Sequence, residues 1–256
     1  PLPLPLVPAP EAGEWLEAAA LLAWRRQQLA GGGEPAAFDW LLEMAAGLPW
    51  SVLQALRLHP ERQARLACSR TWIERLWALH CRHNLPLQYL VGRCPWRDLE
   101  LAVAPGVLIP RQETELLVDL ALSTIADGPA PGLWADLGTG SGCLALALAR
   151  ALPGASGLAT DLSAAALEQA GANGRTHGLA GRLAWLQGSW WQPLEPWWGQ
   201  LELVVSTPPY IPPAVVAELD PVVRCHEPLL ALDGGPDGLA AIRALVAGAP
   251  RGLAAA

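Results

Sequence analysis

The sequence feature that most constrains this chain is a short apolar run that ends in an acid and three glycines spaced two apart. It reads Asp136-Leu137-Gly138-Thr139-Gly140-Ser141-Gly142, and an Ala- and Leu-rich segment with helical spacing follows directly. The pattern predicts a strand, a tight turn and a helix, because glycine is needed where a chain turns sharply or where a ligand lies against bare backbone. The free N–H groups of the helix N-terminus would face that ligand. The alternative is an ordinary strand-to-helix turn that binds nothing.

The spacing within this glycine turn (residues 138–142) narrows the class of ligand. It is Gly-x-Gly-x-Gly rather than the Gly-x-Gly-x-x-Gly of dinucleotide-binding folds. It therefore favours a nucleoside without a pyrophosphate, such as S-adenosylmethionine. Asp161 ends the next predicted strand, about twenty residues further on, where a carboxylate can accept hydrogen bonds from both ribose hydroxyls. Ser163 is the better N-cap for the helix that follows, which leaves Asp161 available to the ligand.

The second half of the chain alternates predicted strands and helices. Strands are expected over 133–137, 155–160, 183–186 and 201–205, and helices over 115–125, 142–152 and 163–177. Such alternation requires a parallel sheet with helices on its faces. The predicted fold class is therefore α/β with a Rossmann-like sheet. Ligands of such sheets bind beyond the carboxyl ends of the strands, so the loops at that edge are the candidate site.

Two consecutive prolines follow the fourth predicted strand, in the segment Thr207-Pro208-Pro209-Tyr210-Ile211, here called the double-proline loop. Because proline has no backbone N–H, the pair forces an extended loop with outward-facing carbonyls. Those carbonyls can accept hydrogen bonds from an –NH2 group, and Tyr210 adds a flat face and a hydroxyl. Trp190 and Trp191 follow the third strand, where one indole can stack on an adenine while the other packs in the core.

The first part of the sequence has a different pattern. Residues 1–10 are proline-rich and are expected to form a disordered tail. Asp39 and Ser51 stand where N-caps would be useful, and Pro60 can open a helix. The pattern predicts a small all-α helical bundle over 11–88, with helices at 14–29, 36–47, 51–56 and 60–83.

A linker is expected between this bundle and the sheet. Residues 86–92 interrupt the helical pattern and 97–103 alternates like one strand of a hairpin, which predicts a hairpin linker over 89–110. The Ile-Pro-Arg loop (residues 109–115) follows, and its prolines make it stiff. Arg111 stands beside two acids there, so a plain surface ion-pair cluster is one interpretation.

Composition argues against several function classes. The chain has 17 basic residues, all Arg, against 24 acidic ones, and a net charge of −7, so no broad nucleic-acid surface is expected. No apolar run reaches about eighteen residues and the N-terminus does not resemble a signal peptide, so neither a membrane span nor secretion is expected. The five cysteines are scattered without a Cys-x-x-Cys pair. Reduced cytoplasmic thiols are therefore expected, and no metal site.

Four stretches together resemble the release factor glutamine methyltransferases, which methylate the glutamine of the Gly-Gly-Gln loop in class 1 peptide chain release factors. They are the Ile-Pro-Arg loop, the glycine turn, the double-proline loop and the Glu-Pro run (residues 227–239). Many methyltransferases share the glycine turn, whereas the first and last stretches are much more restrictive. The resemblance covers about residues 15 to 250. It implies a substrate-recognising helical bundle followed by a class I S-adenosylmethionine-binding domain over 111–256.

The resemblance also implies a role for each site residue. The glycine turn would hold the methionine part of the donor, Asp161 the ribose and Trp190 the adenine region, and Thr207 is expected to contact the donor as well. An amide nitrogen is a poor nucleophile because its lone pair is delocalised, so the main task of the protein is to place it in line with the sulfur–methyl bond. In the family, an Asn at the position of Thr207 and the carbonyl beside Pro208 accept the two amide N–H bonds, while the tyrosine packs against the glutamine.

Two departures from the family pattern carry expectations. A threonine hydroxyl at position 207 can accept a hydrogen bond but reaches less far than an Asn carbonyl, so slower turnover is expected. Family members continue beyond the position of Ala256 with further strands. A truncated sheet with the fourth strand at an open edge is therefore expected, with a melting temperature below about 60 °C.

Three hypotheses result. The first is a monomeric cytoplasmic enzyme that uses S-adenosylmethionine and a release factor, without binding nucleic acid or membranes. The second is a methyltransferase acting on nucleic-acid bases, since Pro-Pro-Tyr loops also serve adenine; the acidic charge disfavours it. The third is a catalytically impaired relic that binds the donor or the release factor.

Overall fold

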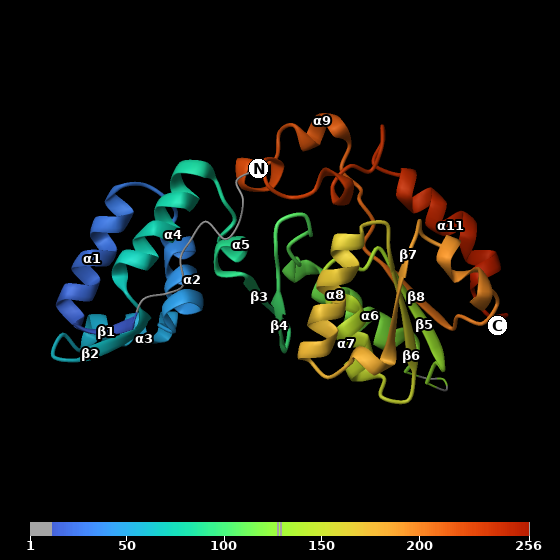
Figure 1. Cartoon of the computed structure of the whole chain (residues 1–256), viewed down its shortest axis with the longest axis horizontal. Helices are drawn as coiled ribbons and strands as arrows, with labels where there is room; N and C mark the ends of the chain where they lie inside the picture. Colours follow the sequence, from blue (N-terminus) through green and yellow to red (C-terminus); the bar gives the residue numbers. More distant parts are fainter. Residues whose placement is uncertain (1–11, 127, 129, 256) are drawn as a thin grey trace. The chain divides into compact units, whose positions relative to one another are not determined.

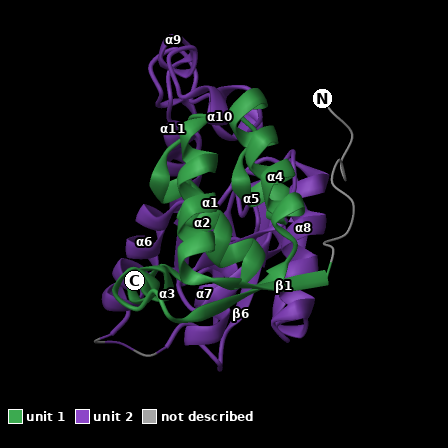
Figure 2. Cartoon of the chain, turned by 90° about the vertical axis from the view of Figure 1, so that its left-hand side faces the viewer, with its two compact units in different colours: residues 1–91 green, residues 92–256 purple. Residues whose placement is uncertain are grey.

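The computed structural model describes residues 12–126, 128 and 130–255, so the predicted tail over 1–10 lies outside the described residues. The chain divides into two compact units, residues 1–91 and 92–256 (Figures 1 and 2). Among the described helices, none has the length and apolar character needed to cross a membrane.

Within residues 12–91, the first unit combines five helices with a two-stranded antiparallel sheet. In chain order its elements are β1 (Ala12–Glu17), α1 (Ala18–Ala30), α2 (Pro35–Ala46), α3 (Trp50–Leu58), β2 (Gln63–Cys68), α4 (Arg70–His83) and α5 (Leu87–Val91). The prediction that this unit is entirely helical is therefore wrong at β1 and β2. The residues of β2 alternate between exposed and buried, with Ala64, Leu66 and Cys68 buried. Pairing between distant segments has overridden the helix propensity of residues such as Ala, Leu, Gln and Arg.

The predicted helix starts in this unit are also corrected. Asp39 lies inside α2, which begins at Pro35, and Ser51 lies inside α3 after its N-cap Pro49. Pro60 opens no helix, because β2 intervenes before α4. α5 occupies most of the stretch in which the helical pattern was expected to break.

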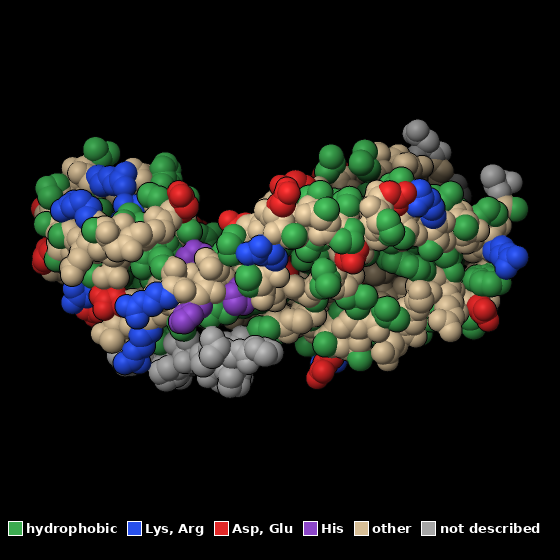
Figure 3. All heavy atoms as spheres, turned by 90° about the horizontal axis from the view of Figure 1, so that it is seen from above, with side chains coloured by type: hydrophobic (Ala, Val, Ile, Leu, Met, Phe, Trp, Pro, Cys, Tyr) green, Lys and Arg blue, Asp and Glu red, His purple; other side chains and the backbone are tan. Residues whose placement is uncertain are grey.

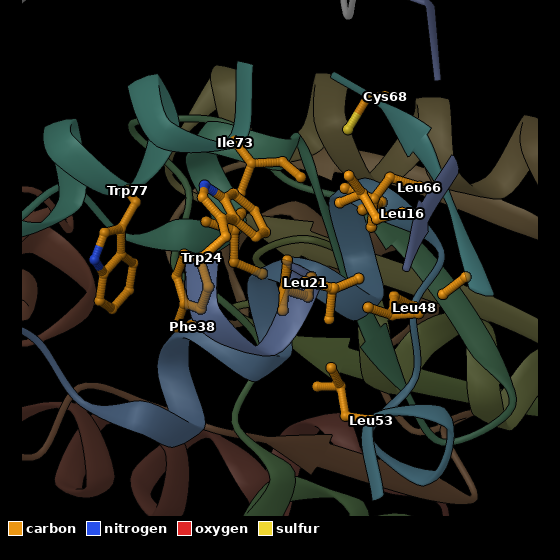
Figure 4. Close-up of a cluster of buried hydrophobic side chains, with 14 of the residues drawn as sticks. Leu16, Leu21, Trp24, Phe38, Leu48, Leu53, Leu66, Cys68, Ile73 and Trp77 are labelled. Atoms are coloured by element: carbon orange, nitrogen blue, oxygen red, sulfur yellow. The ribbon is translucent and has the colours of Figure 1, made fainter. Parts of the chain in front are cut away.

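The core of the first unit is built around three aromatic side chains. The ring centroids of Trp24 and Phe38 lie 5.6 Å apart and those of Phe38 and Trp77 lie 4.9 Å apart, both edge to face (Figure 4). A buried ion pair joins α1 to α2, with Arg25 Nε donating to Asp39 Oδ1 at 2.6 Å and Arg25 Nη2 to Asp39 Oδ2 at 2.8 Å. Asp39 thus ties two helices together instead of capping one.

The second unit carries the predicted α/β pattern. Its elements are a hairpin of β3 (Arg93–Trp96) and β4 (Leu99–Ala102), then α6 (Glu115–Thr124), β5 (Leu133–Leu137), α7 (Cys143–Ala151), β6 (Ser156–Asp161), α8 (Ala164–Thr176), β7 (Leu183–Gln187), β8 (Leu203–Ser206), α9 (Pro213–Val216), α10 (Pro221–Arg224) and α11 (Ala240–Gly252). The hairpin, the four parallel strands and the intervening helices agree with the sequence expectations within a few residues. Thr114, the N-cap residue of α6, makes no side-chain cap hydrogen bond.

The four parallel strands lie in the order β7-β6-β5-β8, so the chain reverses direction across the sheet at β5. Trp134 of β5 belongs to a core cluster with residues of α6 and α7, whereas its neighbour Ala135 belongs to a separate cluster with residues of α11, on the opposite face of the sheet. The open-sheet rule places ligands at such a reversal, beyond the carboxyl ends of the strands. β5 leads there into the glycine turn and β8 into the double-proline loop. Among the described strands, β8 lies at an edge of the sheet.

Helix α8 and its C-cap residue cover the outer edge of β4 with two polar side chains. Buried Asn173 accepts from Ala102 N at 2.8 Å and donates from Nδ2 to Ala102 O at 3.1 Å. Its Nδ2 also donates to Ser141 O of the glycine turn at 2.9 Å. One turn later, His177 Nε2 donates to Glu100 O at 2.9 Å. The hairpin and the glycine turn are therefore fixed to the same helix.

Candidate active site

A cavity of about 790 Å³ opens at the carboxyl ends of the strands, lined by residues of the second unit. This volume is typical of sites for small ligands. The segments that line it are the glycine turn, the stretches 161–163 and 188–190, the double-proline loop, the loop 106–114 and parts of the Glu-Pro run and α11. The glycine turn and the double-proline loop, 65 or more residues apart in sequence, thus face one space.

The glycine turn presents bare backbone to this cavity. Gly138 and Gly140 have φ of +81° and +57°, in the left-handed region that favours glycine. No atom lies within 4 Å of where a Cβ on Gly140 would stand, so the turn faces open space there. Thr139 and Ser141 also line the cavity. Gly142 does not: it precedes α7, and a Cβ there would come within 3.1 Å of Ala170 Cβ on α8.

Asp161 lies at the end of β6, on the cavity wall. Its Oδ2 accepts from Gly140 N at 2.9 Å and its Oδ1 from Ser163 N at 2.9 Å. Each oxygen keeps a lone pair for a further donor. Ser163 Oγ accepts from Ala166 N at 3.2 Å, which confirms the predicted cap of α8. The carboxylate therefore shapes the glycine turn while remaining able to bind a ligand hydroxyl.

The two tryptophans after β7 have separate surroundings. Trp190 lines the cavity with φ of +47°, and a Cβ on Gly138 would come within 3.3 Å of its ring. Trp191 is buried, and its Nε1 donates to Leu245 O of α11 at 2.9 Å. Of the two indoles, Trp190 is the one placed to meet a ligand.

The double-proline loop leaves β8 and reaches the mouth of the cavity. Ser206 Oγ donates to Leu137 O at 2.6 Å, which fixes the loop to the end of β5. Thr207, Pro208, Pro209 and Tyr210 all line the cavity, and Tyr210 is 66% exposed. The side chains available there are therefore two prolines, one hydroxyl and one exposed phenol ring.

An ion pair that sequence reasoning missed lies beside this cavity. Arg111 Nη2 donates to Glu227 Oε1 at 2.7 Å, and Glu227 Oε2 accepts from Ile109 N at 3.1 Å. The sequence suggested a surface cluster of Arg111 with Glu113 and Glu115, but Glu115 instead accepts from Arg97 N. The two partners are 116 residues apart, so no local pattern could pair them. The only signal available in the sequence was that both residues belong to the restrictive family motifs, the Ile-Pro-Arg loop and the Glu-Pro run.

Asp136, at the end of β5, is fully buried beneath the glycine turn. Its Oδ2 accepts from Thr139 Oγ1 at 2.7 Å, while its Oδ1 has no hydrogen-bond partner among the described residues. Burial raises the pKa of this carboxyl from 3.8 to about 7; the hydrogen bond from Thr139 lowers it, and the negative charge of Asp161 raises it further. The folded pKa thus exceeds the unfolded one. The stability contributed by this group is fully present below about pH 4 and is lost as pH rises through about 7.

Asp136→Asn, which cannot ionise, is therefore expected to remove this pH dependence. The melting temperature of the variant minus that of the wild type should increase between about pH 4 and pH 7 and stay level above that range. Melts followed by circular dichroism at steps across the range measure this difference. A difference that stays constant with pH would show that Asp136 is not the titrating group.

Comparison with known proteins identifies the family. Residues 112–218 match the family described as "Methyltransferase small domain". The chain is 48% identical over 240 residues to the release factor glutamine methyltransferase of Prochlorococcus marinus, covering 93% of this chain and 82% of that protein. It is 45% identical to the protein of that name from Gloeobacter violaceus (90% and 79% covered) and 42% identical to that from Synechocystis (88% and 76%). With this identity spread over both units and over the segments that line the cavity, the chain belongs to the release factor glutamine methyltransferase family.

Proposed function

We propose that this protein transfers a methyl group from S-adenosylmethionine to the side-chain amide nitrogen of the glutamine in the Gly-Gly-Gln motif of class 1 peptide chain release factors. The observation that carries the proposal is the single cavity shared by the glycine turn and the double-proline loop. Membership of the family supplies the substrate class. The corresponding place of action is the cytoplasm, where release factors work.

The residues on the donor side fit S-adenosylmethionine. Gly138 and Gly140 leave the room that its methionine part needs, because their backbone carries no side chain into the cavity. Asp161 would accept from the ribose hydroxyls, and the Trp190 ring would cover the adenine region. When bound, this donor supplies a methyl group made reactive by the sulfonium.

The acceptor side has to orient an amide. Carbonyls of the double-proline loop, beside Pro208, and the Thr207 hydroxyl would accept the two N–H bonds of the glutamine amide. These acceptors aim the nitrogen and favour the positive charge that develops on it. Pro209 keeps the loop extended, and Tyr210 would pack against the aliphatic part of the glutamine. No strong base is required, because the alkylated amide loses its proton readily.

The test is methyl transfer by the purified chain from labelled S-adenosylmethionine to a recombinant class 1 release factor. We expect labelling of the wild-type release factor and none of a variant with Gly-Gly-Ala in place of Gly-Gly-Gln. Labelling of DNA or RNA in place of the release factor would instead support the base-modifying hypothesis. The net charge of −7 and the scattered Arg side chains on the face drawn in Figure 3 do not favour that outcome. Binding of donor and release factor without transfer would identify a relic.

Asp161→Ala is expected to weaken the binding of S-adenosylhomocysteine by roughly 10- to 100-fold, the effect of losing charge-assisted hydrogen bonds. The substitution removes the ribose acceptor and releases the Gly140 N–H that shapes the turn. Isothermal titration calorimetry measures the affinity, and Asp161→Asn, which keeps one acceptor oxygen, should lose less. Unchanged affinity in Asp161→Ala would show that this carboxylate does not bind the donor.

A further inference from the structure

The Arg111–Glu227 ion pair joins two loops that border the cavity from far apart in the sequence. The Glu227 side chain is only 2% exposed, and both of its oxygens accept hydrogen bonds from the Ile-Pro-Arg loop. Arg111 is held on a second side, because its Nη1 donates to Ile109 O at 3.1 Å. A carboxylate this deeply buried is costly without its partners, so the two loops are strongly held together here.

On one side of the pair, the Glu-Pro run supports the double-proline loop. Ile211 N donates to Leu232 O at 3.1 Å, and Gly234 N donates to Ile211 O at 2.9 Å. A Cβ on Gly234 would stand 2.6 Å from Tyr210 Cα, so the two backbones are in direct contact. Moving the Glu-Pro run would therefore move the loop that presents Thr207 and Tyr210.

On the other side, the Ile-Pro-Arg loop is fixed to the hairpin, where Trp96 Nε1 of β3 donates to Arg111 O at 2.8 Å. The hairpin is in turn fixed to the glycine turn through Asn173, which bonds both Ala102 and Ser141. These contacts form a ring around the cavity: glycine turn, α8, hairpin, Ile-Pro-Arg loop, Glu-Pro run, double-proline loop, and back through β8 and β5. The ion pair is one of two links between the donor half of this ring and the acceptor half, and the pairing of β5 with β8 is the other.

We propose that Arg111 and Glu227 are positioning residues that hold the double-proline loop at the distance from the glycine turn that methyl transfer needs. This inference rests on the proposed function. Neither residue has to touch the donor for this role, since the glycine turn is held independently by Asp161 and Asn173. Breaking the pair should therefore slow methyl transfer and raise the KM for the release factor, while the affinity for the donor stays unchanged.

The experiment compares Arg111→Met, Glu227→Gln and the double variant with the wild type. We expect kcat to fall by about 100-fold in Arg111→Met, the effect of a misplacement of about 1 Å, with a raised KM for the release factor. The dissociation constant of S-adenosylhomocysteine should stay within about twofold. Because the two residues act through each other, the double variant should be no slower than the slower single variant. Arg111→Lys keeps the charge and should recover part of the loss.

Matched controls and melting temperatures separate positioning from general damage. Arg93 and Glu100 form an exposed ion pair within the hairpin, so Arg93→Met and Glu100→Gln should leave kcat within about threefold. If Arg111→Met does not fold, Glu227→Gln and Arg111→Lys decide. Near-wild-type kcat in the folded pair variants, or donor affinity that falls in step with kcat, would overturn the positioning role. An inactive wild-type protein would instead overturn the proposed function, and this inference with it.

Discussion

Thr207→Asn is expected to raise kcat for release factor methylation by roughly 30- to 1000-fold. The family pattern has Asn at this position, and the side-chain carbonyl of Asn reaches further than the hydroxyl of threonine. Gaining one well-placed acceptor for the amide N–H lowers the barrier by about 2–4 kcal/mol, by analogy with a single group of an oxyanion hole. Single-turnover transfer from labelled S-adenosylmethionine measures the effect directly, because it isolates the chemical step.

Two controls make this result interpretable. Thr207→Val keeps the shape of the side chain but removes its hydroxyl, and it should be slower than the wild type. The affinity for S-adenosylhomocysteine should be similar in all three proteins, since the main donor contacts proposed above, from the glycine turn, Asp161 and Trp190, lie on other segments. Equal rates for the Thr and Asn proteins would mean that the backbone carbonyls of the double-proline loop are enough to orient the amide. That result would contradict the acceptor role of residue 207.

Arg25→Met is expected to destabilise the first unit by about 3–5 kcal/mol, the usual cost of leaving a buried charge unpaired. Both side chains of the Arg25–Asp39 pair are only 11% exposed, and they are joined by two short hydrogen bonds. For a unit of this size the loss lowers the melting temperature of that unit by more than about 10 °C. Differential scanning calorimetry of the whole chain can follow the transition of this unit.

The double variant Arg25→Met/Asp39→Leu tests the cause. Removing both charges leaves none unpaired, so most of the lost stability should return. Glu61→Gln provides the control, because Glu61 pairs with His59 at an exposed site, and its melting temperature should stay close to that of the wild type. A double variant as unstable as Arg25→Met would show that packing around Arg25, rather than the bare Asp39 charge, sets the loss.

The second unit was largely predictable because its signals are local. Glycines with positive φ, a serine cap before α8 and strands that alternate with helices each leave a pattern within about fifteen residues. The strand β1 leaves none, and β2 leaves only a short polar–apolar alternation over Gln63–Leu66. The two strands pair over about fifty residues, as in Glu14 with Leu66 and Leu16 with Ala64. Their composition also suits a helix, so only tertiary pairing distinguishes the two outcomes.

The candidate site was likewise predictable only where its signals are local. The segments that follow β5, β6 and β8 were located because the ends of parallel strands meet at one edge of the sheet. The inclusion of Gly142 extended the pattern one residue too far, since this glycine faces α8. Asn173 and the partner of Arg111 were missed because their contacts span 71 and 116 residues, and neither residue type signals a particular partner.

The cover that α8 gives to β4 has a consequence for association between copies of this protein. A short exposed strand ordinarily invites a strand from another molecule to join it. Here the outward N–H and C=O of Ala102 and the C=O of Glu100 are already occupied by the side chains of one helix. The helix and its C-cap residue imitate a neighbouring strand, so the outer edge of β4 is closed to intermolecular addition although this strand contains neither proline nor lysine.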